Sequence, residues 1–133
     1  MILTGYFDGA SRGNPGDAGA GALLVDESGV VLWRAAKYLG KKTNNEAEYN
    51  AAILLIKAAR ERNAKKLLVR GDSKLVVSQL AKQWKINLPH LRELAQEAWR
   101  AADTMEVTYE WIPREQNKDA DKLSNEAIDK AAK

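Results

Sequence analysis

Hydrophobic positions in the first third of the chain form short β-rich runs. We expect strands at residues 2–8, 20–25 and 30–38. Residues 26–29 have the length and turn chemistry of a hairpin, and the dense turn residues at 9–16 predict a loop after the first run. This part of the chain therefore predicts three strands joined by short links.

The remaining two thirds alternate helical patterns with single β-rich runs. We expect strands at residues 66–70 and 107–112, and helices at 43–62, 73–81, 88–102 and 115–132. Strands joined by short links pair antiparallel, whereas strands separated by helices add as parallel neighbours. The pattern predicts an α/β fold: one mixed five-stranded sheet, with strand 2 antiparallel and helices on both faces.

Composition narrows the class of protein. A length of 133 residues without a repeat or long linker predicts one domain over residues 1–133. The absence of cysteine excludes disulfides and thiolate metal sites. The longest apolar run in a predicted helix is too short for a membrane span, and the amino terminus lacks a secretory pattern, so we expect a cytoplasmic protein without a membrane partner. A net charge of +3 permits a polyanionic partner without demanding one.

Two aspartates stand at the ends of predicted strands. Asp8 ends the first strand and, by strand alternation, shares a face with interior-leaning residues such as Tyr6. Asp72 follows the strand at 66–70 and precedes a helix. Each has a plain structural explanation, the start of a turn for Asp8 and a helix N-cap for Asp72. If their strands are parallel neighbours, both carboxylates lie at the carboxyl edge of the sheet, where functional sites gather.

Two further acids lie early in predicted helices. Thr43 and Glu46 have the spacing of a capping box, so we interpret Glu46 as structural. Glu48 is not needed for that box and heads an apolar helical stripe, where a carboxylate is costly unless a positive charge compensates it. Asp121 lies near the start of the last helix, where stabilisation by the helix dipole is an equal explanation. Asp119 points about 200° away from Asp121.

The four acids together favour a metal site. Clustered carboxylates repel one another and raise each other's pKa unless a cation lies between them. An oxygen-only ligand set suits Mg²⁺ or Mn²⁺. Two such ions can activate a water and stabilise the leaving oxygen in phosphodiester cleavage, so no nucleophilic side chain is required.

Four sequence blocks resemble type 1 ribonuclease H. They are DGASRGNPG (residues 8–16), TNNEAE (43–48), GDS (71–73) and NKDADKL (117–123), and the resemblance covers essentially the whole chain. It implies the ribonuclease H fold and endonucleolytic cleavage of RNA in an RNA–DNA hybrid. It also implies products with 5′-phosphate and 3′-hydroxyl ends, and two Mg²⁺ or Mn²⁺ ions per active site with substrate bound. We expect a monomer.

The resemblance also implies roles for individual residues. Asp8, Glu48 and Asp72 match the central catalytic metal ligands, Asp121 matches a peripheral fourth ligand, and Glu48 also matches the carboxylate that meets a 2′-hydroxyl. The residues that match contacts to the hybrid are Asn14, Thr43, Asn44 and Asn45, with Thr43 at a DNA phosphate. Amides suit this task because they can donate to and accept from a 2′-hydroxyl, the group that distinguishes RNA from DNA.

The first departure from the family pattern is a missing histidine. Many members carry one in the loop before the last helix, but residues 112–117 contain none. The single histidine, His90, belongs to another helix, and we expect it to be exposed. We hypothesise that Arg114 partly takes over this role by contacting the scissile phosphate or assisting product release.

The second departure is the missing basic protrusion. Residues 82–89 are short, and we expect Trp84, with Lys82 and Lys85, to make a reduced contact to the DNA strand. A partly buried helix-end aromatic is an equal explanation of Trp84. The other tryptophans, at positions 33, 99 and 111, are expected in the core. This compact pattern is more similar to archaeal and plant-like members.

Two other functions compete with this interpretation. One is a different nuclease of the same superfamily, acting on duplex RNA or a junction, with the same carboxylate chemistry. The asparagines argue for a substrate with 2′-hydroxyls. The other is a non-catalytic module that binds hybrids, and the presence of all four acids argues against it.

Overall fold

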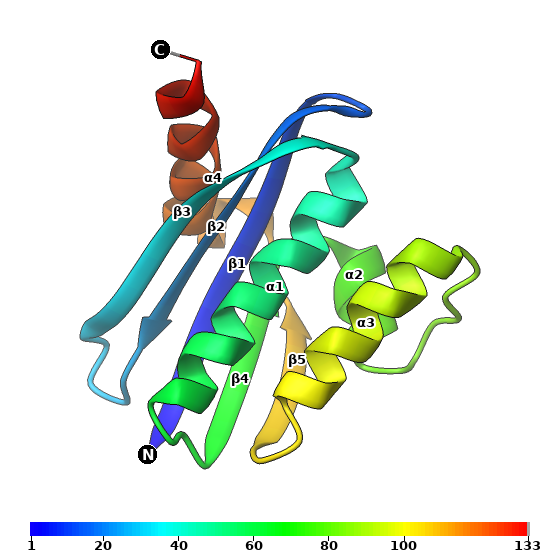
Figure 1. Ribbon diagram of the computed structural model, residues 1–133. Helices are drawn as coiled ribbons and strands as arrows, with labels where there is room; N and C mark the ends of the chain where they lie inside the picture. The colour runs from blue at the N-terminus through cyan, green and yellow to red at the C-terminus, as the bar shows by residue number, and fades with distance from the viewer. Residues whose placement is uncertain (133) are drawn as a thin grey trace.

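The computed structural model describes residues 1–132 and contains one five-stranded sheet in the order β3-β2-β1-β4-β5 (Figure 1). In chain order the elements are β1 (Ile2–Gly13), β2 (Gly16–Val25), β3 (Val31–Lys42), α1 (Asn44–Glu61), β4 (Lys66–Gly71), α2 (Lys74–Leu80), α3 (Pro89–Ala101), β5 (Glu106–Trp111), the 3₁₀ turn η1 (Arg114–Gln116) and α4 (Lys118–Ala131).

The strand directions confirm the predicted mixed sheet. β2 pairs antiparallel with both β1 and β3, whereas β4 pairs parallel with β1 and with β5. In Figure 1, α1, α2 and α3 lie in front of the sheet, and α4 lies behind β2 and β3. Helices therefore cover both faces, as the sequence predicted. No helix within residues 1–132 is both long and apolar enough to span a membrane.

β1 and α1 pack closely together in the core. Alanines line the sheet-facing side of α1, and Ala47, Ala51 and Ala52 are fully buried. Gly9 of β1 packs directly on this helix, because a Cβ added there would overlap the backbone of Ala47 and Glu48. Small residues on both elements thus let the start of α1 touch the middle of β1.

The first strand is longer than predicted, and the loop expected at residues 9–16 is wrong. β1 continues to Gly13 because its second half pairs with the start of β2, from Gly9 opposite Ala20 to Gly13 opposite Gly16. Only Asn14 and Pro15 remain as the turn. The turn-forming residues at 9–13 were a poor guide to a loop. Their backbone N–H and C=O groups are paired in the ladder with β2, so the strand continues through them.

The face assigned to Asp8 was also wrong. Leu3 and Phe7 point into the core, whereas Tyr6, on the same face as Asp8, is only half-buried. The core therefore lies on the α1 side of the sheet. Asp8 projects from the opposite, more open side of the strand, although its own carboxyl group is buried.

Side-chain caps define the starts of α1 and α2. The predicted capping box is present: Glu46 N donates to Thr43 Oγ1 at 3.2 Å, and Thr43 N donates to Glu46 Oε1 at 2.9 Å. α2 is capped by Ser73 rather than Asp72, since Val76 N donates to Ser73 Oγ at 3.2 Å. Asp72 therefore has no capping role, and the structural explanation given for it above does not hold.

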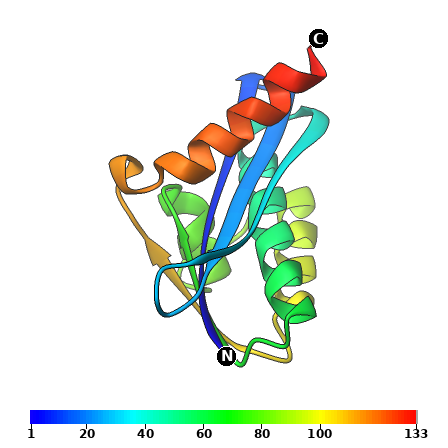
Figure 2. The same ribbon diagram turned by 90° about the vertical axis from the view of Figure 1, so that its left-hand side faces the viewer.

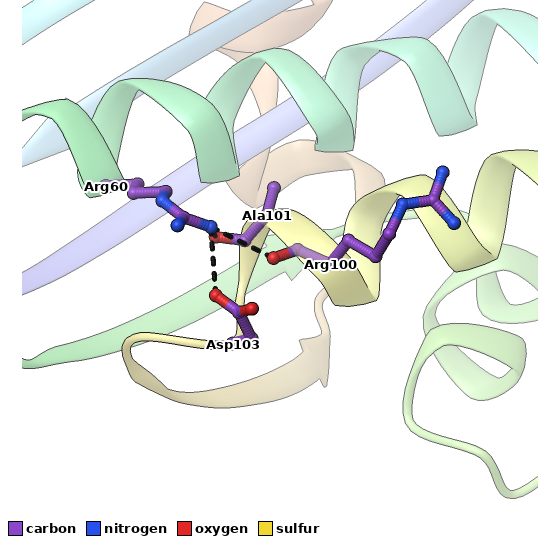
Figure 3. A network of polar contacts seen from close by, with 4 residues as sticks. All are labelled: Arg60, Arg100, Ala101 and Asp103. Atoms are coloured by element: carbon purple, nitrogen blue, oxygen red, sulfur yellow. Dashed lines mark hydrogen bonds and ion pairs between the residues drawn. The ribbon is translucent and has the colours of Figure 1, made fainter.

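The ends of α1 and α3 are joined by one arginine (Figure 3). Arg60 Nη1 donates to the backbone carbonyls of Arg100 at 3.0 Å and Ala101 at 3.4 Å, and to Asp103 Oδ1 at 2.9 Å. The last carbonyls of a helix lack intrahelical partners and carry partial negative charge. A cation at this position satisfies them and fixes α3 against α1.

We predict that Arg60→Ala lowers the free energy of unfolding by about 1 kcal/mol, because α3 loses its carboxyl-terminal donor. Lys57→Ala is the matched control. Lys57 lies on the same helix and pairs only with Glu97, at 3.4 Å on the surface, so its loss should change stability by less than about 0.5 kcal/mol. Urea unfolding measures both, and equal losses would contradict the assignment.

Candidate active site

Three acids from distant parts of the chain converge at the carboxyl end of β4. Asp8 of β1, Glu48 of α1 and Asp72 after β4 each offer a carboxylate oxygen, and these oxygens lie within 4.8 Å of one another. β4 ends at Gly71, paired with Phe7, so the next residue of each strand carries one of the two aspartates. The close contact of α1 with Gly9 brings Glu48 to the same place.

Asp121 lies on the same cavity as these three acids. The open cavity measures about 480 Å³ and is lined by Asp8, Gly9, Ala10, Ser11, Asn44, Glu48, Asp72, Ser73, Arg114, Asp121 and Asn125. Asp119, two residues earlier in α4, instead lines hollows between α4 and the sheet. The predicted separation of Asp121 from Asp119 is therefore present.

Few hydrogen-bond donors face the cluster. Gly9 N donates both to Asp8 Oδ1 at 3.0 Å and to Glu48 Oε1 at 2.6 Å. Glu48 Oε2 is buried and has no hydrogen-bond partner among the described residues. A buried carboxylate oxygen without a donor is costly unless a cation is bound there.

Burial and mutual repulsion raise the pKa of all three central acids. Burial raises the pKa of Asp8 from 3.8 to about 7, and the charges of Asp72 and Asp121 act in the same direction, while the hydrogen bond with Glu48 opposes them. Burial, followed by the neighbouring Asp8, raises the pKa of Glu48 well above its ordinary value. Burial also raises the pKa of Asp72, although Asn117 and Arg114 oppose it. Among the described residues that line the cavity, Arg114 is the single cation, so the four acids there outnumber it, and their oxygen donors fit a hard divalent cation.

Asn117 is a site residue to which the sequence interpretation gave no role. It is 1% exposed, and its Nδ2 donates to Asp72 Oδ2 at 3.2 Å and to the backbone carbonyl of Phe7 at 2.9 Å. It thus ties the start of α4 to β1 and to the acid after β4. The available signal was its position one turn before Asp121 on the same helix face.

Asn125 was missed in the same way. Its Nδ2 donates to the backbone carbonyl of Asp121 at 3.0 Å and to Asp121 Oδ1 at 3.3 Å. Because it lies four residues after Asp121, helical spacing alone could have indicated this contact. Asn125 therefore orients the fourth acid toward the cavity that both residues line.

The residues expected to contact a hybrid lie at the turn between β1 and β2 and at the start of α1. Asn14 is in that turn, and its Oδ1 accepts from Asn44 N at 3.1 Å. Thr43 caps α1, and Asn45 is half-buried beside it. We call these four residues (Asn14, Thr43, Asn44 and Asn45) the amide rim.

Arg114 and Trp84 lie in different places relative to the cavity. Arg114 is exposed and lines it beside Asp72. Trp84 is 47% exposed and follows α2 in a loop that does not line the cavity. His90 is exposed in the first turn of α3, as predicted.

Two of the three remaining tryptophans lie at the edge of the core, whereas the sequence predicted them inside it. Trp33 and Trp99 are partly buried and pack against the core. For Trp111 the prediction is wrong, because this side chain is 46% exposed at the end of β5. β5 is an edge strand, and Trp111 is its last residue.

The chain is similar to proteins of known family along most of its length. The family model described as reverse transcriptase-like matches residues 6–127. Ribonuclease HI of Halobacterium salinarum is 43% identical over 129 residues, covering 95% of this chain and 64% of the relative. A bifunctional protein of Mycobacterium tuberculosis is 42% identical over 127 residues, covering 94% of this chain and 35% of its own length. The chain thus spans less than two thirds of these two curated relatives.

Solved structures match both the fold and the extent of the chain. RNase H1 of Halobacterium salinarum has a TM-score of 0.94 at 39% identity, covering 98% of this chain and 99% of that one. LC11-RNase H1 in complex with an RNA/DNA hybrid has a TM-score of 0.94 at 36% identity, with the same coverage of both chains.

We predict that Asp8→Asn stabilises the metal-free protein. A raised pKa means that the folded state binds more protons than the unfolded state, so the wild type loses stability as the pH rises from about 4 to about 7. A pKa of about 7 in place of 3.8 sets an upper limit of about 4 kcal/mol, and we expect about 2 kcal/mol at pH 8 in EDTA.

Urea unfolding with and without Mg²⁺ tests this expectation. Added Mg²⁺ should stabilise the wild type more than the variant, because a ligand that binds only the folded state shifts the equilibrium toward it. Asp119→Asn is the control. It should change neither the stability at pH 8 in EDTA nor the stabilisation by Mg²⁺. A variant less stable than the wild type at pH 8 in EDTA would refute the electrostatic explanation.

Proposed function

The chain belongs to the ribonuclease H family, and from this we propose that it is an endonuclease that hydrolyses the RNA strand of RNA–DNA hybrids. The products carry 5′-phosphate and 3′-hydroxyl ends. The observation that supports this proposal best is the carboxylate cluster of Asp8, Glu48 and Asp72 at the carboxyl edge of the sheet. The neighbour in complex with an RNA/DNA hybrid has nearly the same fold, which supports the choice of substrate.

In this proposal Asp8, Glu48 and Asp72 hold divalent cations, and Asp121 is a peripheral fourth ligand. The cluster offers only oxygen donors, which favours Mg²⁺ or Mn²⁺. Two such ions, if bound there with substrate, would supply activation of a water and stabilisation of the leaving oxygen. Asn117 holds Asp72 in place, and Asn125 holds Asp121.

The chain's own residues account for selection of RNA. Glu48 lines the same cavity as Asp8 and Asp72, a position that suits its carboxylate to an interaction with the 2′-hydroxyl of a bound RNA strand. On the amide rim, Asn14 uses its Oδ1 to accept from Asn44 N, which leaves its Nδ2 to donate to a sugar or base. Contacts of this kind to sugar and phosphate position the duplex without reading its sequence.

Two peripheral residues complete the proposal. Arg114 brings a positive charge to the edge of the cavity beside Asp72, where it contacts the scissile phosphate or assists product release. Trp84 presents nearly half of its surface outside the cavity, so with Lys82 and Lys85 it contacts the DNA strand. The cytoplasmic location and the monomeric state stay predictions.

A related nuclease that cuts duplex RNA or junctions is the second candidate, because it would share the carboxylate chemistry. The amide rim favours a substrate with 2′-hydroxyls but does not by itself decide between a hybrid and duplex RNA. A cleavage assay on matched duplexes separates these functions.

We predict that the protein cleaves an RNA–DNA duplex in Mg²⁺ and leaves RNA–RNA and DNA–DNA duplexes of the same sequence intact. EDTA should abolish cleavage. Asp8→Asn should lower kcat at least about a thousandfold and Asp121→Asn about tenfold or more, since both alter the charge that holds the cations.

Asp119→Asn is the matched control for Asp121→Asn, because it removes the same charge from the same helical turn but faces elsewhere. Its kcat should equal that of the wild type. Equal cleavage of RNA–RNA would redirect the proposal to the second candidate, and full activity of Asp8→Asn would exclude this cluster as the active site.

We further predict that Arg114→Ala and Trp84→Ala affect different steps. Arg114→Ala should lower kcat about tenfold with a small change in hybrid Kd, because its charge acts at the cavity. Trp84→Ala should raise Kd about fivefold and leave kcat at saturating substrate unchanged. Arg100→Ala, an exposed arginine at the far end of α3, serves as the control. If Arg114→Ala or Trp84→Ala has the same kcat and Kd as Arg100→Ala, the proposed contact of that residue with the hybrid is wrong.

A further inference from the structure

Trp111 is an exposed aromatic side chain that is hydrogen-bonded to the backbone of Asp72, one of the clustered acids. Its indole Nε1 donates to the backbone carbonyl of Asp72 at 3.1 Å, although the side chain is 46% exposed. Figure 2 shows the end of β5, in orange, rising beside α2 toward the turn before α4. The indole is thus fixed one hydrogen bond away from a residue of the proposed active site.

A lysine lies over the same indole. Lys74 Nζ is 5.9 Å from the centroid of the Trp111 ring. Lys74 is exposed, and no carboxylate of residues 1–132 lies within salt-bridge distance of it. It is also the first residue of α2, where the helix dipole disfavours a cation. Its position is therefore poor for helix stability and suited to an external anion.

Strand pairing alone does not require this indole. The ladder between β4 and β5 already reaches Trp111, which pairs with Gly71, and Ile112 N donates to the carbonyl of Gly71 at 2.9 Å. The end of β5 is therefore fixed by its backbone. A rigid, half-exposed indole beside an unpaired ammonium is a common arrangement at nucleic-acid contacts, where the aromatic packs on a sugar or base and the cation pairs with a phosphate.

We infer that Trp111 and Lys74 form a contact for the RNA strand outside the carboxylate cavity, with the indole against a ribose and the ammonium on an adjacent phosphate. This inference rests on the proposed function. A scissile phosphate held at Asp72 places the neighbouring nucleotides of the same strand near Ser73, which lines the cavity, and Lys74 follows Ser73 directly. The amide rim and Trp84 lie on other elements, so this contact is separate from theirs.

Hybrid binding in the Asp8→Asn background, where the proposed function predicts cleavage at least about a thousandfold slower, tests the contact. We expect Trp111→Leu to raise the hybrid Kd about fivefold and Trp111→Phe, which keeps an aromatic ring, to raise it less than about twofold. Lys74→Gln should lower the slope of log Kd against log salt by about 0.9, the value for one phosphate contact. Lys66→Gln, an exposed lysine at the opposite end of β4, should leave the slope unchanged.

Two further measurements distinguish a direct contact of Trp111 and Lys74 with the hybrid from a purely structural role of these residues. Saturating hybrid should quench less tryptophan fluorescence in Trp111→Phe than in the parent protein. Neutral methylphosphonate linkages in the RNA strand should remove the effect of Lys74→Gln, because that phosphate no longer carries a charge, whereas the same linkages in the DNA strand should preserve it.

The outcomes are distinct. Unchanged Kd, slope and quenching in these variants, in a protein that binds hybrids and whose wild type cleaves them, overturn the contact and leave the proposed function intact. Loss of the Lys74→Gln effect only with a neutral DNA strand overturns the assignment to RNA. If Trp111→Leu is unfolded, the salt dependence of Kd in Lys74→Gln and the fluorescence quenching in Trp111→Phe decide whether the contact exists. Failure of the wild type to bind or cut a hybrid overturns both proposals.

Discussion

The structure depends on a concentration of negative charge that the protein alone does not neutralise. Asp8 and Glu48 are almost fully buried and share one backbone donor at Gly9, and each has a carboxylate oxygen within 4.8 Å of one of Asp72. Burial and repulsion both oppose ionisation, which is why the pKa of each acid is raised. A fold that keeps this arrangement must hold the acids by its backbone, because their own interactions push them apart.

Backbone geometry supplies that restraint. β4 stops beside Phe7, which places Asp8 and Asp72 at the same level of the sheet, and Gly9 lets α1 approach closely enough to bring in Glu48. Asn117 then joins α4 to both strands through one amide. Each restraint uses hydrogen bonds or close packing and adds no positive charge. A lysine or arginine in place of these restraints would reduce the negative charge that suits the cluster to a cation.

The sequence predicted those features that are local or that follow from a repeated pattern. The order of elements, the capping box at Thr43 and the burial of Glu48 all follow from spacing along the chain. The length of β1 and the exposure of Trp111 did not, because they depend on which strand lies alongside and which helix covers an edge. Asn117 was missed for a similar reason, since its amide acts on residues more than forty positions away.

The residues around the carboxylate cluster differ in charge from one side to the other. This difference suits them to two separate tasks, choice of the sugar and strength of binding. The amide rim is uncharged and can discriminate a 2′-hydroxyl without attracting phosphates at long range. Arg114, Lys74 and Trp111 lie around Asp72, where cations and an aromatic surface favour backbone contacts whose strength falls with salt. Under the proposed function and the contact inferred above, choice of sugar falls to the turn after β1 and the start of α1, and strength of binding to β5, η1 and the start of α2. On that proposal, a chain without a basic protrusion would hold a polyanion close to its acids through contacts distributed around the cavity.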